Sequence, residues 1–211
     1  MQISLRSFFI AFIGCIILGG GVLFVIQYQQ SQTREPEISL SPVPDYPVVV
    51  ARSAASEPQV TNVLSPDGSK KIQMKVESKP DNEKFYSFAI FDKEGNNEQQ
   101  IFTRIVSETS ELFLPENSWS PDNKYVFIQE KTKGAITTLV FKASGESFAN
   151  DQQYLDATTL FTQRQTGYTF DTATGWADPT LLIIRTKKDD GTKGPSYWFV
   201  IPTKAFLQLA R

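Results

Sequence analysis

Few side chains in this chain could perform acid-base or nucleophilic chemistry. It contains no histidine, and its single cysteine, Cys15, lies inside an apolar N-terminal run. Serine-histidine and cysteine-histidine nucleophile pairs, zinc sites of cysteine and histidine, and histidine-bound haem are therefore excluded. Acid-base catalysis would have to rest on carboxylates, lysine or tyrosine.

The carboxylates that could do such work fall mostly in predicted turns. They include Asp67, Asp92, Glu94, Asp122, Asp189 and Asp190. In turns, such residues cap the backbone and face water, and nothing here indicates a glycosidase-type pair. The segment Asp189-Asp190-Gly191 lacks the alternating oxygen ligands of an EF-hand calcium loop. A serine-lysine pair of Ser65 with Lys70 or Lys71 competes with a turn role for Ser65. We expect no catalytic, metal-binding or cofactor-binding residue.

A four-residue phrase occurs twice, as Ser65-Pro66-Asp67-Gly68 and Ser120-Pro121-Asp122-Asn123. Proline presets φ for a type I turn, aspartate caps the turn, and glycine or asparagine accepts the left-handed conformation that follows. Each phrase precedes a run that alternates apolar and polar residues. Each therefore predicts a tight turn that leads into a β-strand.

The alternation predicts a chain made mainly of β-meanders. Strands are expected near residues 71–77, 85–91, 100–106, 125–128, 136–141, 181–184 and 197–201. Short helices are expected at 155–163, with Asp156 near the N-cap, and at 203–210. The turn serines Ser65 and Ser120 lie 55 residues apart, and Trp119 and Trp176 lie 57 apart, so two markers give nearly one period. This agreement predicts a repeat architecture.

The N-terminal segment is predicted to cross a membrane. Residues 8–26 are nineteen uncharged, mostly apolar residues, enough to span a bilayer core of about 30 Å. Arg6 precedes them, which places the N-terminus in the cytoplasm and the body outside. A cleaved signal peptide would need a small-x-small site after Ile26, and a lipobox at Cys15 would end the apolar run there. Residues 1–27 are thus expected to be a signal-anchor.

The next segment, residues 28–58, is expected to be an extended linker, because it is rich in proline, serine and glutamine. Its Val48-Val49-Val50 could add an edge strand to the body, or be an extended apolar patch. Residues 59–211 form the predicted β-domain outside the membrane. The 21 basic and 23 acidic side chains of the chain nearly cancel, which does not favour a nucleic-acid partner.

The phrase from Trp119 to Phe127 resembles the WD40-like β-propeller repeat of the TolB type. The segment from Leu64 to Ile72 is similar, but leucine stands at the usual aromatic position. Residues 175–183 match in Trp176, the turn residues and the apolar strand that follows. The resemblance covers about residues 60–205 and implies propeller blades, without implying a particular function.

Blades of such repeats take about 40 to 45 residues, and a closed ring usually needs at least four. This body offers about three. It could be an open fragment of a propeller, a compact array plugged by its own connections, or half of a ring that a second copy completes as a homodimer. Trp119, Trp176 and Trp198 would pack between sheets, and one exposed at a rim would be a contact for a ligand. Trp198 is the candidate contact.

These observations predict a membrane-anchored extracytoplasmic module that binds a protein or a polymer and is not an enzyme. They predict a mainly β fold, a partial propeller-like array of about three blades, preceded by one transmembrane helix. Two alternatives stay open. One is an envelope hydrolase that acts through carboxylates, and the other is a structural subunit of an envelope complex.

Overall fold

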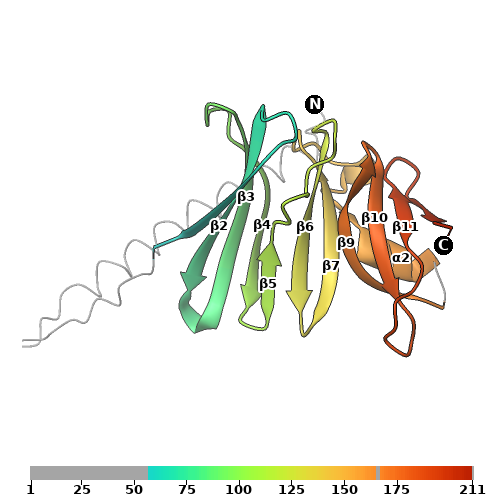
Figure 1. Ribbon diagram of the computed structural model, residues 1–211. Coiled ribbons are helices and arrows are strands. Elements are labelled where there is room, and N and C mark those ends of the chain that lie inside the picture. Colours follow the sequence, from blue (N-terminus) through green and yellow to red (C-terminus); the bar gives the residue numbers. More distant parts are fainter. Residues whose placement is uncertain (1–56, 165–166, 211) are drawn as a thin grey trace, which may run out of the picture. The chain divides into compact units, whose positions relative to one another are not determined.

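Three antiparallel sheets of four strands each make up the body of the chain (Figure 1). The computed structural model describes residues 57–164 and 167–210. The prediction of a mainly β body with antiparallel meanders is confirmed. The predicted anchor, the linker up to residue 56 and Val48-Val49-Val50 lie outside the described residues. Within those that are described, no helix has both the length and the apolar character needed to cross a bilayer.

Each sheet is a meander whose strands follow one another in chain order. Sheet A contains β1 (Gln59–Leu64), β2 (Lys70–Lys79), β3 (Glu83–Asp92) and β4 (Gln99–Ser107). Sheet B contains β5 (Ser110–Phe113), β6 (Tyr125–Thr132), β7 (Ala135–Lys142) and β8 (Leu155–Asp156). Sheet C contains β9 (Thr169–Asp178), β10 (Leu181–Lys187), β11 (Tyr197–Val200) and β12 (Ala205–Gln208). Two 3-10 turns, η1 (Pro80–Asn82) and η2 (Ala149–Asp151), lie in the connections.

One of the two expected helices forms and the other does not. Helix α2 (Ala157–Arg164) begins after Asp156, whose carboxylate accepts a hydrogen bond from the Thr159 amide at 2.9 Å, as an N-cap does. The helix predicted at residues 203–210 is wrong, because Ala205–Gln208 form strand β12. Pairing with β11 places Phe206 opposite Phe199, with stacked rings 4.7 Å apart. This cross-strand packing outweighs the weak helical preference of so short a segment.

The middle sheet, sheet B, is buried on both faces. Along β6, Val126 and Ile128 enter the hydrophobic cluster shared with sheet A, while Phe127 enters the one shared with sheet C. The same division separates Phe141 from Val140 along β7. Successive side chains of a strand point to opposite faces, so a strand covered on both sides needs a continuous apolar run. This is why β6 and β7 lack the polar alternation of β2.

The outer sheets each turn one face toward sheet B. In β2, Ile72 and Met74 are buried against sheet B, whereas Lys71 and Gln73 point to the opposite face. Figure 1 shows the three sheets side by side in chain order, from β2 and β3 through β6 and β7 to β10. Two separate hydrophobic clusters therefore hold the stack together, one at each junction.

A tryptophan ties each sheet to the one before it. The indole Nε1 of Trp119 donates to the carbonyl oxygen of Val63 at 3.1 Å, and that of Trp176 donates to the carbonyl oxygen of Ser118 at 3.0 Å. Val63 and Ser118 each stand two residues before the serine of a Ser-Pro-Asp phrase. The same hydrogen bond therefore recurs at the junction of sheets A and B and at that of B and C.

Polar side chains also cross the junctions. The buried amide of Gln129 in β6 donates to the Thr172 hydroxyl and to the Ala173 carbonyl of sheet C, at 3.0 Å each. On the other side, Arg104 of β4 forms an ion pair with Glu130 of β6 at 2.7 Å. Each junction thus combines apolar packing with specific hydrogen bonds.

Replacing Trp119 by phenylalanine should lower the free energy of unfolding by about 1 kcal/mol or more, because the buried ring remains but its hydrogen bond to Val63 is lost. Chemical denaturation of the full chain measures the change. Trp198→Phe is the matched control, since Trp198 lies on the outer face of sheet C. Equal losses in the two variants would contradict the linking role of Trp119.

Candidate binding surface

The first Ser-Pro-Asp phrase closes the turn between β1 and β2. The Ser65 hydroxyl donates to the Asp67 carboxylate at 2.8 Å and accepts from the Lys70 amide at 2.9 Å. The Gly68 amide donates to the Ser65 carbonyl at 2.9 Å, and Gly68 adopts a φ of 68°. Pro66 occupies the second position of the turn. All four residues of the phrase thus take part in backbone geometry.

The second phrase repeats this geometry before β6. The Ser120 hydroxyl donates to Asp122 at 2.8 Å and accepts from the Tyr125 amide at 2.9 Å. The Asn123 amide donates to the Ser120 carbonyl at 3.0 Å, and Asn123 adopts a φ of 59°. Pro121 stands where Pro66 does. The two serines are buried and fully engaged in their turns.

The aspartates of both turns are held in the ionised form. The pKa of Asp67 is lowered far below its usual range by the Ser69 amide and then by the Ser65 hydroxyl, with the Asn123 side chain adding to the effect. Partial burial pushes the pKa of Asp122 upward. Hydrogen bonds from Ser120 and Lys124 outweigh that effect, so the pKa is lowered overall. A carboxylate with a depressed pKa is a poor proton donor or acceptor near neutral pH.

The structure does not assemble the serine-lysine pair. Ser65 meets the backbone amide of Lys70, and Lys71 places its Nζ over the Phe91 ring, 5.4 Å from the centroid. No base therefore activates the Ser65 hydroxyl, and its hydrogen bonds are those of a turn.

The other turn carboxylates cap their own loops. Asp92 accepts from the Asn96 amide at 2.7 Å, and Asp190 accepts from the Thr192 hydroxyl at 2.6 Å. The Thr192 hydroxyl, followed by its amide, lowers the pKa of Asp190. Among residues 57–164 and 167–210, no group of three histidine, cysteine or acidic residues could hold a metal ion.

A shallow hollow lies on the rim beside the second turn. Its volume is about 320 Å³, and its lining includes Lys70, Lys124, Lys142 and Glu146. Lys124 pairs with Asp122 at 3.1 Å, and Lys142 donates to the Ser147 carbonyl at 2.9 Å. Asp122 offsets the charge of Lys124, and the Glu146 carboxylate lies 3.9 Å from the Lys142 ammonium, so the hollow has little excess charge to hold a ligand.

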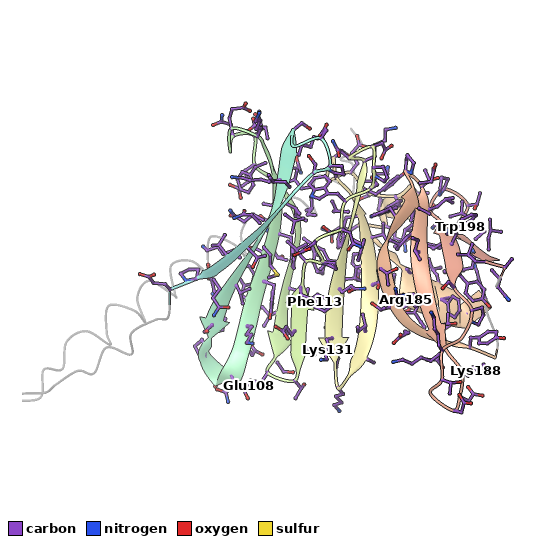
Figure 2. All side chains as sticks on the ribbon, viewed as in Figure 1. Glu108, Phe113, Lys131, Arg185, Lys188 and Trp198 are labelled. Atoms are coloured by element: carbon purple, nitrogen blue, oxygen red, sulfur yellow. The ribbon has the colours of Figure 1, made fainter. Side chains whose placement is uncertain are left out.

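The strongest candidate surface is the outer face of sheet C, which we define by Leu181, Ile183, Trp198, Val200, Ala205 and Leu207. The strand register aligns these side chains. Ile183 lies opposite Trp198, and Trp198 lies opposite Leu207, whose side chain is 50% exposed. Neighbouring positions Leu182 and Phe199 point the other way, into the cluster shared with sheet B. Figure 2 shows Trp198 and the exposed Arg185 on this sheet. Three adjacent strands therefore present apolar side chains on this face, of which Leu207 is exposed and the other five are half-buried.

The opposite end of the stack has a mixed surface. We define the outer face of sheet A by its apolar members Val60, Leu64, Phe85, Phe91 and Ile105, with a polar row from β2. That row contains Lys71, Gln73, Lys75 and Glu77. Lys79 stacks over Phe85 at 5.2 Å, and Lys75 pairs with Glu77 at 2.8 Å. The two ends of the stack therefore differ in polarity.

Of the residues singled out in the sequence, the structure places Trp119 and Trp176 at sheet junctions and Trp198 on the outer face of sheet C. Sequence reasoning missed the neighbours of Trp198, namely Ile183 and Leu207. One signal was available. Apolar residues occupy both alternating positions from 181 to 184, as in β6, and this pattern indicates a strand suited to burial on both faces.

Comparison with known proteins gives little further information. No protein-family model matches the chain, and no curated protein sequence matches it. Two solved structures of the AtxE2 isopeptidase are similar at low level. The form with Astexin3-dC4 bound, a serine-to-alanine variant, gives a TM-score of 0.48 at 12% identity over 74% of this chain and 30% of that one. The apo form gives 0.46 at 10% identity over 71% and 28%. The chain thus spans less than a third of these proteins, and a likeness this weak carries no argument about activity.

Replacing Asn123 by valine should lower the free energy of unfolding by about 1 kcal/mol or more, because a β-branched residue resists the positive φ at this position. Chemical denaturation measures the change. Asn123→Gly is the matched control, because glycine keeps the backbone conformation while the side chain is lost. A glycine variant as unstable as the valine variant would refute the backbone explanation.

Replacing Ser65 by alanine should reduce the acid sensitivity of the fold. The native pKa of Asp67 lies below the unfolded value of about 3.9, so its stabilising contribution is present above about pH 4 and is lost as pH falls through the native pKa. Removing the Ser65 hydroxyl raises the native pKa toward the unfolded value. The stability gap between wild type and variant should therefore be constant from pH 7 to about pH 5 and should narrow as pH falls below about 4 toward the native pKa of wild type, as followed by thermal unfolding. A gap that is constant with pH would contradict the coupling.

Proposed function

We propose that this chain is a membrane-anchored extracytoplasmic binding module, and that its body is a partial propeller of the WD40-like type. Three features support the propeller assignment. Each sheet is a four-stranded meander in chain order, the sheets stack face to face, and the same tryptophan hydrogen bond recurs at both junctions. Repeats of this kind build binding surfaces by stacking identical units.

The membrane anchor is the apolar segment of residues 8–26, preceded by Arg6. The arrangement of charge puts the body outside the cytoplasm. The body also contains no cysteine, so its stability in an oxidising compartment depends on core packing rather than on disulfides. The segment that includes residues 28–56 would hold the body away from the membrane.

The observation that carries the binding role is the outer face of sheet C. A contiguous apolar patch with an aromatic side chain at its centre is typical of a protein interaction site. Trp198 has Ile183 on one side and Leu207 on the other, and both are aligned by the strand register. A glycan would require a dense set of hydrogen-bonding groups, which these side chains do not supply. The partner is therefore a protein.

A binding role is also supported by the state of the polar residues. The turn serines and several of the turn aspartates are engaged in hydrogen bonds with their own loops. These side chains stabilise their own turns. The outer face of sheet C is therefore the surface available for recognition. The face lies on regular strands, which present side chains at fixed positions.

A photo-crosslinking amino acid at position 198 should yield a specific protein adduct in intact cells that express the full chain. The same amino acid at position 131, on β6 and away from this face, is the matched control (Figure 2). The adduct is identified by mass spectrometry, with the crosslinked peptide mapped to residue 198. Equal yields at both positions, or no adduct at position 198, would refute the proposed binding face.

A further inference from the structure

We infer that the protein partner is a second copy of this chain. The outer face of sheet C of one copy docks on the outer face of sheet A of the other, and two copies close a ring of six sheets. This inference rests on the proposed binding role of the sheet C face and names its occupant. Four observations carry it.

The first observation is that, in the part of the chain that the structure describes, sheet A has no tryptophan contact to a preceding sheet. The strand register pairs Trp119 with Val126 and Trp176 with Leu182, and it pairs Leu64 with Lys71 in sheet A. Leu64 is thus the counterpart of the two tryptophans, which reach back to the preceding sheet. No described sheet precedes sheet A, and the Leu64 side chain is 64% exposed. Its position is that of a contact whose receiving sheet is absent from the described residues.

The second observation is a receiving site of the right kind at the other end. Trp176 packs on Tyr125 and Phe127 of sheet B, with ring centroids 6.2 and 6.3 Å apart. Phe127 follows Val126, the residue paired with Trp119. The equivalent residue of sheet C is Ile183, because it follows Leu182, which the register pairs with Trp176. Ile183 points outward, as Leu181 does. A second copy can therefore insert its Leu64 against Ile183 as Trp176 inserts against Phe127.

The third observation concerns where apolar surface is exposed. Four large hydrophobic side chains of the described residues are at least half exposed, namely Val60, Leu64, Ile105 and Leu207. The first three lie on the outer face of sheet A, and Leu207 lies on that of sheet C. A closed pair of copies covers all four at once.

The fourth observation concerns number and symmetry. A β-propeller usually closes with four to eight blades, and the described residues of this chain supply three sheets. Two copies related by a half-turn would supply six sheets, which is within this range, and they form the smallest head-to-tail assembly that can close. The polar row of β2, with Lys71 and Lys75, makes one side of the contact partly hydrophilic. The ring is therefore expected to form reversibly and to dissociate on dilution.

The first test measures the mass of the full chain in detergent by light scattering corrected for bound detergent. Wild type should have twice the chain mass of 23.7 kDa. Leu64→Asp and Ile183→Asp should each give the single-chain mass, because either substitution damages both contacts of the ring. Ala135→Asp, at an exposed hairpin position, is the control and should keep the double mass. Circular dichroism checks that each variant is folded.

Mixing the two face variants separates this arrangement from its alternatives. Each mixed pair keeps one intact contact, so the mixture should regain the double mass at high concentration. If instead one face pairs with the same face of the second copy, the variant whose substitution lies on the other face stays fully dimeric without mixing. That result would overturn the head-to-tail contact. A double mass that survives both substitutions would place the contact elsewhere, and a single-chain wild type at high concentration would remove it altogether.

Disulfide trapping supplies a readout that does not depend on disruptive substitutions. In a Cys15→Ser background, Leu64→Cys mixed with Ile183→Cys should yield a covalent dimer on mild oxidation. Neither variant alone should form a covalent dimer, because the cysteines of its two copies occupy the same position and lie far apart in the ring. Crosslinking of either variant with itself, or no crosslink in the mixture, would overturn the contact.

The two proposals fail in different ways. If the crosslinker at position 198 captures a different protein and the chain has the single-chain mass, the binding face stands and the second copy is excluded. If the adduct maps within the chain's own residues 1–56, the face is covered internally and both proposals fail. If the adduct joins residue 198 to the sheet A face of another copy, both are supported.

Discussion

The stack depends on burying sheet B on both of its faces. Strands β6 and β7 supply apolar side chains in both alternating directions, so sheets A and C can each pack a full face against them. Removal of apolar surface from water is the main favourable term in such packing. One repeated sheet cannot bury its apolar face alone, so the stacked neighbours supply the core. The tryptophan hydrogen bonds then fix the position of each sheet relative to the last, because the indole donor must meet one particular carbonyl oxygen.

Turn chemistry sets the start of each outgoing strand. In both Ser-Pro-Asp turns, one hydroxyl joins the aspartate to the first amide of the strand, which fixes where the strand begins. The Ser69 amide and the Ser65 hydroxyl lower the pKa of Asp67, and hydrogen bonds from Ser120 and Lys124 outweigh the effect of burial on the pKa of Asp122. The aspartates that were candidates for acid-base chemistry in the sequence therefore stabilise the turns. Among the described residues, no group of three histidine, cysteine or acidic residues could hold a metal ion. We propose that recognition falls to the faces of the end sheets.

Each end sheet has one face without a neighbouring sheet among the described residues, and this supports the proposed binding role. Stacked repeats are stabilised by neighbours, and a terminal repeat without one either carries a polar outer face or needs a partner. The outer face of sheet A is partly polar, because it carries Lys71, Gln73 and Lys75. The outer face of sheet C has few polar side chains around Trp198. The leucine at position 64, where the sheet junctions have tryptophan, fits the same picture.

The sequence alone determined the local features of this protein. Alternation in β2 and the turn residues of the two phrases specify structure within a few positions, because strand period and positive φ are local constraints. The N-cap of α2 at Asp156 is local in the same way. Tertiary structure decided what depends on distant partners. Ala205–Gln208 form strand β12 because β11 places Phe199 opposite Phe206. Trp198 points outward because its neighbours Tyr197 and Phe199 face sheet B. Which face of a strand meets water is set by what packs against it, and that information lies far away in the chain.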